Sequence, residues 1–127
     1  LGCGVKMPGC RIIHHCGKQI HHFDYRGAGA DEVLELFDHA NTILLEHADE
    51  AELYFIADYT GVPITKAGIV KLHGAKARRA NKAVTRAAIL GVQGLGQTIL
   101  NTFNAIMDKE YRAVDDMPAA LAHICES

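Results

Sequence analysis

The sequence predicts an α/β domain with a mixed, mostly parallel sheet packed by helices. Short apolar runs of β type alternate with segments whose apolar residues recur at helical spacing, and two β-type runs separated by a tight turn precede them. The expected order of elements is ββαβαβαβα. The 127 residues are a normal length for one domain. We expect a single domain over 11–127, preceded by a loose glycine-rich segment over 1–10.

A hairpin is expected first, with strands over 11–16 and 19–25. The residues between them, Gly17-Lys18, suit a type II′ turn because glycine comes first. The first helix is expected over 31–47, where carboxylates at its start favour the positive end of the helix dipole. Its inner side is expected to consist of Val33, Leu36, Phe37, Ala40 and Leu44.

The later elements follow the same two patterns. The continuous apolar run 52–58 predicts a strand covered on both faces, and the loop 59–65 ends at Thr65, a suitable helix N-cap. A second helix is expected over 66–82, with Ile69, Leu72 and Ala80 inside. The remaining elements are a strand over 85–92, a helix over 94–107 that buries Leu95, Ile99, Phe103 and Ile106, a strand over 111–114, and a helix over 118–125 with Asp116 as its N-cap and Pro118 in its first turn.

The four cysteines are expected to be free thiols. None of them forms a C-x-x-C pair, and a domain of this size builds a core without disulfides. A cytoplasmic protein is expected because the first ten residues lack the charged-then-apolar pattern of a secretory signal. No apolar run approaches the roughly 18 residues of a membrane span. The cysteines are Cys3, Cys10, Cys16 and Cys125.

Charge is distributed unevenly, although the net charge is only −2. The stretch 31–58 is acidic without lysine or arginine, and the stretch 66–107 is basic without acids. Neighbouring helices that neutralise each other explain this pattern, and an acidic partner is the alternative. Nucleic acid is not expected, because the basic stretch lacks aromatic residues for base stacking. The basic cluster is Lys71, Lys76, Arg78, Arg79, Lys82 and Arg86.

A glycine-rich turn precedes the expected helix 94–107. The run 91–98 fits a phosphate-binding loop except that Gln97 replaces the lysine, so nucleotide hydrolysis is not expected. Backbone N–H groups of Gly94, Leu95 and Gly96 could still hold an anion. The alternative is that the glycines only permit a tight turn from strand to helix.

The hairpin carries the residues with the most potential for chemistry. With Gly17-Lys18 as the turn, His14 faces His21 on one side, and Cys16 lies nearby. These three side chains could ligate zinc, and Cys16 with His14 could form a Cys–His couple. They alternate with apolar strand residues, however, so our interpretation is structural. We expect no metal, no cofactor and no catalytic residue.

Four stretches give the chain a resemblance to a known family. They are K-Q-I-H-H-F-D-Y-R-G (18–27), F-I-A-D-Y-T-G (55–61), A-A-I-L-G-V-Q-G-L (87–95) and V-D-D-M-P-A-A-L (114–121). In this order they resemble the bacterial STAS-like family, related to anti-sigma-factor antagonists (SpoIIAA-like). The resemblance implies a regulatory domain without catalysis, whose phosphorylated serine position corresponds most nearly to Thr65. The D-S-S-G motif of the antagonists is absent here.

The sequence thus predicts a non-catalytic domain that binds a protein partner. The contact residues are expected to be Asp58, Thr60 and Thr65 together with Lys76, Arg79 and Lys82 on the second helix. The alternative is a carrier or sensor of a small apolar or anionic ligand, of the Sec14-like type. A cryptic enzyme is the third hypothesis, and a homodimer is compatible with each.

Overall fold

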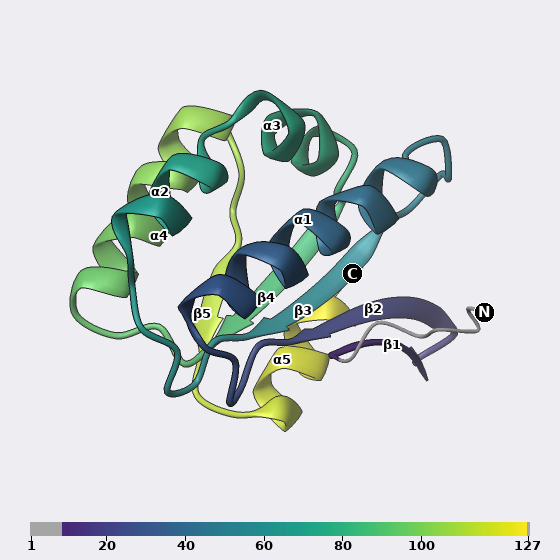
Figure 1. The fold of residues 1–127 in the computed structure, drawn as a ribbon. Helices are drawn as coiled ribbons and strands as arrows, with labels where there is room; N and C mark the ends of the chain where they lie inside the picture. The colour runs from purple at the N-terminus through teal and green to yellow at the C-terminus, as the bar shows by residue number, and fades with distance from the viewer. Residues whose placement is uncertain (1–8, 127) are drawn as a thin grey trace.

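A five-stranded sheet forms the centre of the structure, a computed structural model that describes residues 9–126 (Figure 1). β1 pairs antiparallel with β2, and each later strand pairs parallel with the one before it. The order across the sheet equals the order along the chain, so the predicted fold class and order of elements are confirmed. The strands are β1 (Cys10–His15), β2 (Lys18–Asp24), β3 (Tyr54–Asp58), β4 (Arg86–Leu90) and β5 (Arg112–Val114).

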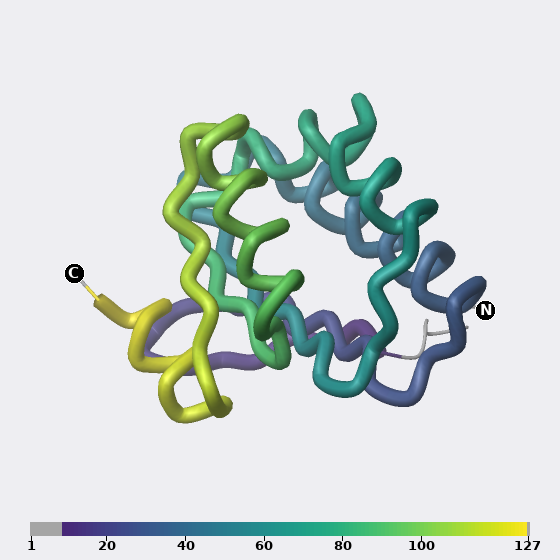
Figure 2. The backbone as a smooth tube through the Cα atoms, turned by 90° about the vertical axis from the view of Figure 1, so that its left-hand side faces the viewer, coloured from purple at the N-terminus to yellow at the C-terminus, as the bar shows by residue number. Residues whose placement is uncertain are grey.

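Four helices cover one face of the sheet and one helix covers the other (Figure 2). Parallel strands joined through a helix make right-handed crossovers. Every crossover here steps in the same direction, so all the crossover helices lie on one face. The chain turns to the opposite face only after β5. The crossover helices are α1 (Ala30–Glu46), α2 (Lys66–Leu72), α3 (Ala75–Lys82) and α4 (Leu95–Met107), and α5 (Met117–Ile124) lies opposite.

The hairpin turn differs from the prediction. Its central residues are Cys16 and Gly17, with φ angles of 49° and 75°, as in a type I′ turn. The predicted type II′ turn at Gly17-Lys18 is therefore wrong. In the observed register His14 pairs with Gln19 and His21 pairs with Ile12. His14 and His21 are thus not partners across the hairpin.

Two helices also depart from the prediction. The expected second helix is broken at Gly74, which becomes the N-cap of α3 while α2 ends at Leu72. Glycine is costly inside a helix, so the break falls at the weakest position. The expectation that Leu95 and Ile106 are buried is wrong, since both side chains are largely exposed. The inner face of α4 instead contains Gly96, Leu100 and Phe103.

The predicted helix starts are confirmed where a side chain caps them. The hydroxyl of Thr65 accepts a hydrogen bond from the Gly68 amide at 3.0 Å. The carboxylate of Asp116 accepts one from the Ala119 amide at 2.9 Å. Such caps satisfy N–H groups that the first helical turn leaves free.

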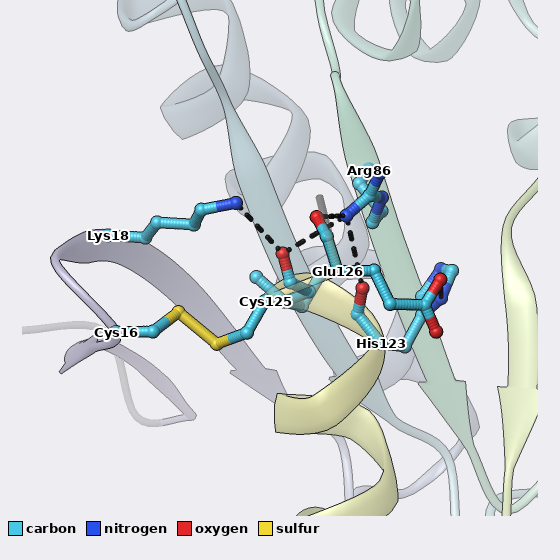
Figure 3. Close-up of a disulfide and its surroundings, with 7 residues drawn as sticks. Cys16, Lys18, Arg86, His123, Cys125 and Glu126 are labelled. Atoms are coloured by element: carbon cyan, nitrogen blue, oxygen red, sulfur yellow. Dashed lines mark hydrogen bonds and ion pairs between the residues drawn. A yellow bond between two sulfur atoms is a disulfide. The ribbon is translucent and has the colours of Figure 1, made fainter.

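A disulfide joins the hairpin to the end of α5. Cys16 and Cys125 are bonded, with their Cα atoms 6.2 Å apart (Figure 3). The prediction of free thiols is therefore wrong for both residues. Cys10 is half-buried and has no disulfide partner among residues 9–126, and Cys3 lies outside the described residues.

Two cations hold the same end of α5. Lys18 donates to the carbonyl of Ile124 at 3.2 Å, and Arg86 donates to the carbonyls of His123 and Ile124 at 3.3 Å (Figure 3). Cations favour the C-terminal end of a helix, where carbonyl groups are unpaired. The disulfide and these contacts together fix α5 against the sheet.

The beginning of the chain is described only in part. Of the segment 1–10 that we expected to be loose, residues 1–8 lie outside the described residues. Cys10 begins β1, and the carbonyl of Gly9 accepts a hydrogen bond from the Asp24 amide at 2.6 Å. Within 9–126, no helix has the length and apolar character needed to cross a membrane.

Candidate functional site

A cavity of about 200 Å³ lies between the sheet and the helices that cover its first face. Strands β2, β3 and β4 form its floor, and α1, α2 and α4 form its walls. Most of the lining is aliphatic or aromatic. Small side chains on both layers, Ala57 on β3 and Ala40 on α1, leave space that larger residues would fill. The aromatic residues of the lining are Phe23, Tyr25, Phe37, Phe55, Tyr59, Phe103 and Tyr111.

The cavity meets solvent beside the loop that leads into α2. Pro63, Ile64 and Gln93 belong to its lining and are exposed. Ile64 also lies against α4, since a Cβ atom at Gly96 would be 3.7 Å from its Cδ1. The absence of a side chain at Gly96 therefore lets the loop approach α4 at the entrance.

Within the described residues 9–126, no charged side chain lines this cavity. The lining contains no aspartate, glutamate, lysine, arginine or histidine. Its tyrosines are also uncharged at neutral pH: burial raises the pKa of Tyr59 to about 12, and burial raises the pKa of Tyr25 and Tyr111 as well. The cavity is therefore suited to a neutral, mainly apolar occupant.

Two asparagine amides in the lining differ in their hydrogen bonding. Asn81 donates to the carbonyl of Ala77 at 2.8 Å and accepts from the Tyr111 hydroxyl at 2.7 Å. Asn41 on α1 is only 4% exposed and makes no side-chain hydrogen bond in the range 9–126, but its amide atoms are not among the fully enclosed ones without a partner. Asn81 thus belongs to the scaffold, whereas Asn41 has unused donors and an unused acceptor.

The predicted partner residues at the end of β3 form a local network. Asp58 accepts hydrogen bonds from the Thr60 amide at 2.9 Å and the Thr60 hydroxyl at 2.6 Å. Arg26 lies 3.4 Å from the Asp58 carboxylate and 2.7 Å from that of Asp24. These contacts satisfy a buried carboxylate and fix the loop after β3. Thr65 lies further along this loop, in the cavity wall.

The predicted basic residues lie at the other end of the sheet, on α3. Lys76 lies 3.5 Å from the Asp38 carboxylate of α1, and Lys71 of α2 lies 3.6 Å from it. This confirms that neighbouring helices partly neutralise each other. Arg79 and Lys82 are exposed and make no ion pair within the described residues. The structure therefore does not bring the two predicted groups of contact residues together.

The predicted anion loop borders a separate, polar hollow. Gly94 lines this hollow with Thr60, Gly91 and Asp115. Gly91 must be glycine, because its φ is 82° and a Cβ atom there would overlap the backbone of Thr60. No lysine or arginine lines the hollow, and Leu95 points its side chain largely into solvent. The contacts of these residues explain a tight turn from strand to helix.

The predicted metal candidates are separated. The sulfur of Cys16 is in the disulfide and is not available as a thiolate. His14 is exposed, whereas His21 is buried with its ring centre 4.6 Å from that of His47. Within 9–126, no group of three histidine, cysteine or acidic side chains has an arrangement that could hold a metal ion.

Comparisons of the chain with protein-family models, curated proteins and solved structures found no match. The resemblance to STAS-like proteins therefore remains a prediction from four short stretches.

Sequence reasoning offered a pocket under the helices only as part of its alternative hypothesis, a carrier or sensor, and it assigned neither Asn41 nor any other residue of the lining to that pocket. A signal for Asn41 was present, since this residue is polar on the apolar face of α1, between Phe37 and Leu44 in the helical repeat. Nothing in the sequence shows that this face borders a cavity, because a tightly packed core has the same pattern.

Proposed function

We propose that this protein is a non-catalytic domain that binds one small apolar molecule in the cavity between its sheet and helices. The observation that carries the proposal is an apolar, charge-free cavity of about 200 Å³ with an exposed entrance. Interiors are normally packed with few voids larger than a water molecule. A ligand would bury apolar surface there and restore the missing contacts. Such a cavity is needed both by a protein that carries a small molecule and by one that senses it.

A matched pair of variants on α2 tests this proposal. Ile69 lines the cavity, while its neighbour Val70 does not and is 64% exposed. Ile69→Trp is expected to fill the cavity and abolish binding of indole, and Val70→Trp is expected to leave binding unchanged. Titration of amide chemical shifts by NMR measures both. No saturable binding of indole to the unaltered protein, or equal binding by the two variants, would refute the proposal.

A second candidate function is binding of an acidic protein partner through α3. Its support is that Arg79 and Lys82 are exposed without an ion pair in the described chain, whereas Asp38 neutralises Lys76. Charges of this kind act mainly by steering association. With a captured partner, Arg79→Glu should slow association at low salt, while Lys66→Glu on α2 should not. Equal association rates would leave α3 as a solvated surface.

A further inference from the structure

Three features of the cavity specify the chemistry of its ligand more closely than apolar character alone. The first feature is the size of the cavity. An engineered apolar cavity of about 150 Å³ binds benzene, and the present cavity is about 200 Å³. It therefore accommodates one ring with a small substituent. Aromatic side chains on the floor and walls, such as Phe55 and Phe103, offer the ring edge-on and offset contacts.

The second feature is the absence of charge. A carboxylate or ammonium group loses its hydration on entering such a site and needs a partner of opposite charge. Within 9–126, none of the side chains in the lining supplies one. The carboxylates of Asp24 and Asp58, at the ends of β2 and β3, are already paired with Arg26. An ionised ligand is therefore excluded from the inner part of the cavity.

The third feature is the amide of Asn41. Polar groups inside proteins normally have a hydrogen-bond partner or contact with solvent. Asn41 is 4% exposed, lies in the lining and makes no side-chain hydrogen bond within 9–126. Its amide atoms are not among the fully enclosed atoms without a partner, so they are not sealed off from the space that the lining surrounds. The other buried asparagine of the lining, Asn81, uses its amide within the protein. Asn41 is therefore the group in the wall best placed to meet a polar atom of the ligand.

We propose that the ligand is an uncharged aromatic molecule of about ten non-hydrogen atoms, with one amide or hydroxyl group that hydrogen-bonds to Asn41. This inference rests on the proposed function, since it specifies what the same cavity holds. Asn41 is a binding residue in it, and the surrounding aromatic residues provide the apolar contacts.

A series of ligands with nearly equal size tests the inference on the unaltered protein. The probes are benzamide, benzyl alcohol, toluene and benzoate at pH 7, measured by NMR titration. Benzamide or benzyl alcohol is expected to bind at least about twentyfold more tightly than benzoate, because the carboxylate has no partner. Benzoate binding as tightly as benzamide would overturn the inference and leave the proposed function intact. Failure of every probe, toluene included, would overturn both.

Asn41→Leu separates a ligand contact from a structural role. Leucine has a similar volume without polar atoms, so benzamide should bind about fivefold to tenfold more weakly and toluene at least as tightly. Asn101→Leu on α4 is the control, since Asn101 is exposed and does not line the cavity. Unchanged benzamide binding by Asn41→Leu, or an equal loss of toluene and benzamide binding, would overturn the role of Asn41.

Discussion

Three buried histidine side chains, His21, His22 and His123, have ring nitrogens without a hydrogen-bond partner in the described residues. The pKa of each of the three histidines is lowered from 6.5, and burial is the largest cause in each case. For His21, the neighbouring His47 lowers the pKa further and Glu50 raises it. The folded protein therefore keeps these rings neutral at a pH where the unfolded chain takes up protons.

We predict that the free energy of unfolding falls as the pH drops below about 6.5. The unfolded chain binds protons there first, and each such histidine contributes at most about 1.4 kcal/mol per pH unit. Urea unfolding at pH 7.5, 6.5 and 5.5 measures the slope. His21→Phe should reduce the slope near pH 6, and equal stabilities at the three pH values would contradict the prediction.

The carboxyl group of Asp24 affects stability in a separate pH range. Arg26 lowers the pKa of Asp24 to about 2, so the contribution of this carboxylate to the free energy of unfolding is lost only as the pH falls below about 4.

Glycines at two turns allow a matched test of close packing. Gly91 and Gly27 have similar φ angles, 82° and 79°, but a Cβ atom would overlap Thr60 only at Gly91. Both alanine variants have the cost of a left-handed backbone, about 1–2 kcal/mol. Gly91→Ala should cost about 1–3 kcal/mol more, because the loop after β3 must also move. Chemical unfolding measures the free energy of unfolding of both variants. Equal losses of stability would show that the loop after β3 moves at no cost, and would contradict the prediction.

Residue-level predictions from sequence succeeded where the determinants are local. Thr65 and Asp116 cap helices through amides three residues away, so their neighbours in the sequence suffice to identify them. The pairing of His14 with His21 failed because it depended on which two residues form the hairpin turn. A shift of that turn by one residue changes every pair along the strands.

At the scale of elements, the end of α5 combines a covalent bond with charge contacts. The disulfide from Cys16 to Cys125 spans 109 residues of sequence. Lys18 and Arg86 hold the last carbonyls of the helix, and its buried residues Ala120 and Ile124 pack on the sheet. The helix thus has several attachments, and only one of them depends on the redox state.

We predict that Cys16→Ser/Cys125→Ser lowers the free energy of unfolding but leaves the native fold intact. A covalent loop of roughly 100 residues stabilises by about 4–5 kcal/mol in the chain-entropy description. The measurement is guanidinium unfolding with and without reductant. Cys10→Ser is the control, because this half-buried thiol forms no disulfide within the part of the chain that the structure describes, and its replacement should leave the effect of reductant unchanged. Equal unfolding midpoints for the oxidised and reduced protein would contradict the prediction.

The order of elements was predictable because each has its own hydrophobic period. Strand β3 is a continuous apolar run, and α1 repeats its apolar residues at helical spacing. The break at Gly74 was visible as a glycine inside an expected helix, but the apolar pattern on both sides masked it. The disulfide was not predictable, because its two residues lie at opposite ends of the sequence and only the sheet brings them together.

At the scale of the whole molecule, the cavity arises from how the layers meet. The lining residues of α1, α2 and α4 have the apolar periodicity of an ordinary core. Whether such faces pack fully or leave space depends on the separation of helices and sheet, which involves Ala40, Ala57 and Gly96 together. The distance between the helices and the sheet cannot be read from a single sequence. The fold was therefore predictable, whereas a pocket under the helices could be offered only as an alternative, without its residues.

The disulfide also makes residues 16–125 a closed covalent ring, so that one backbone cut between Cys16 and Cys125 leaves the two pieces joined. The exposed turn between Asp49 and Glu50, ahead of β3, is a place to make that cut with an inserted protease site. The two pieces should then migrate as one species without reductant and as two with it. While the disulfide links the two pieces, their effective concentration relative to each other is in the millimolar range. The cut protein should therefore refold after dilution from denaturant when oxidised, and fail to do so at micromolar concentration when reduced.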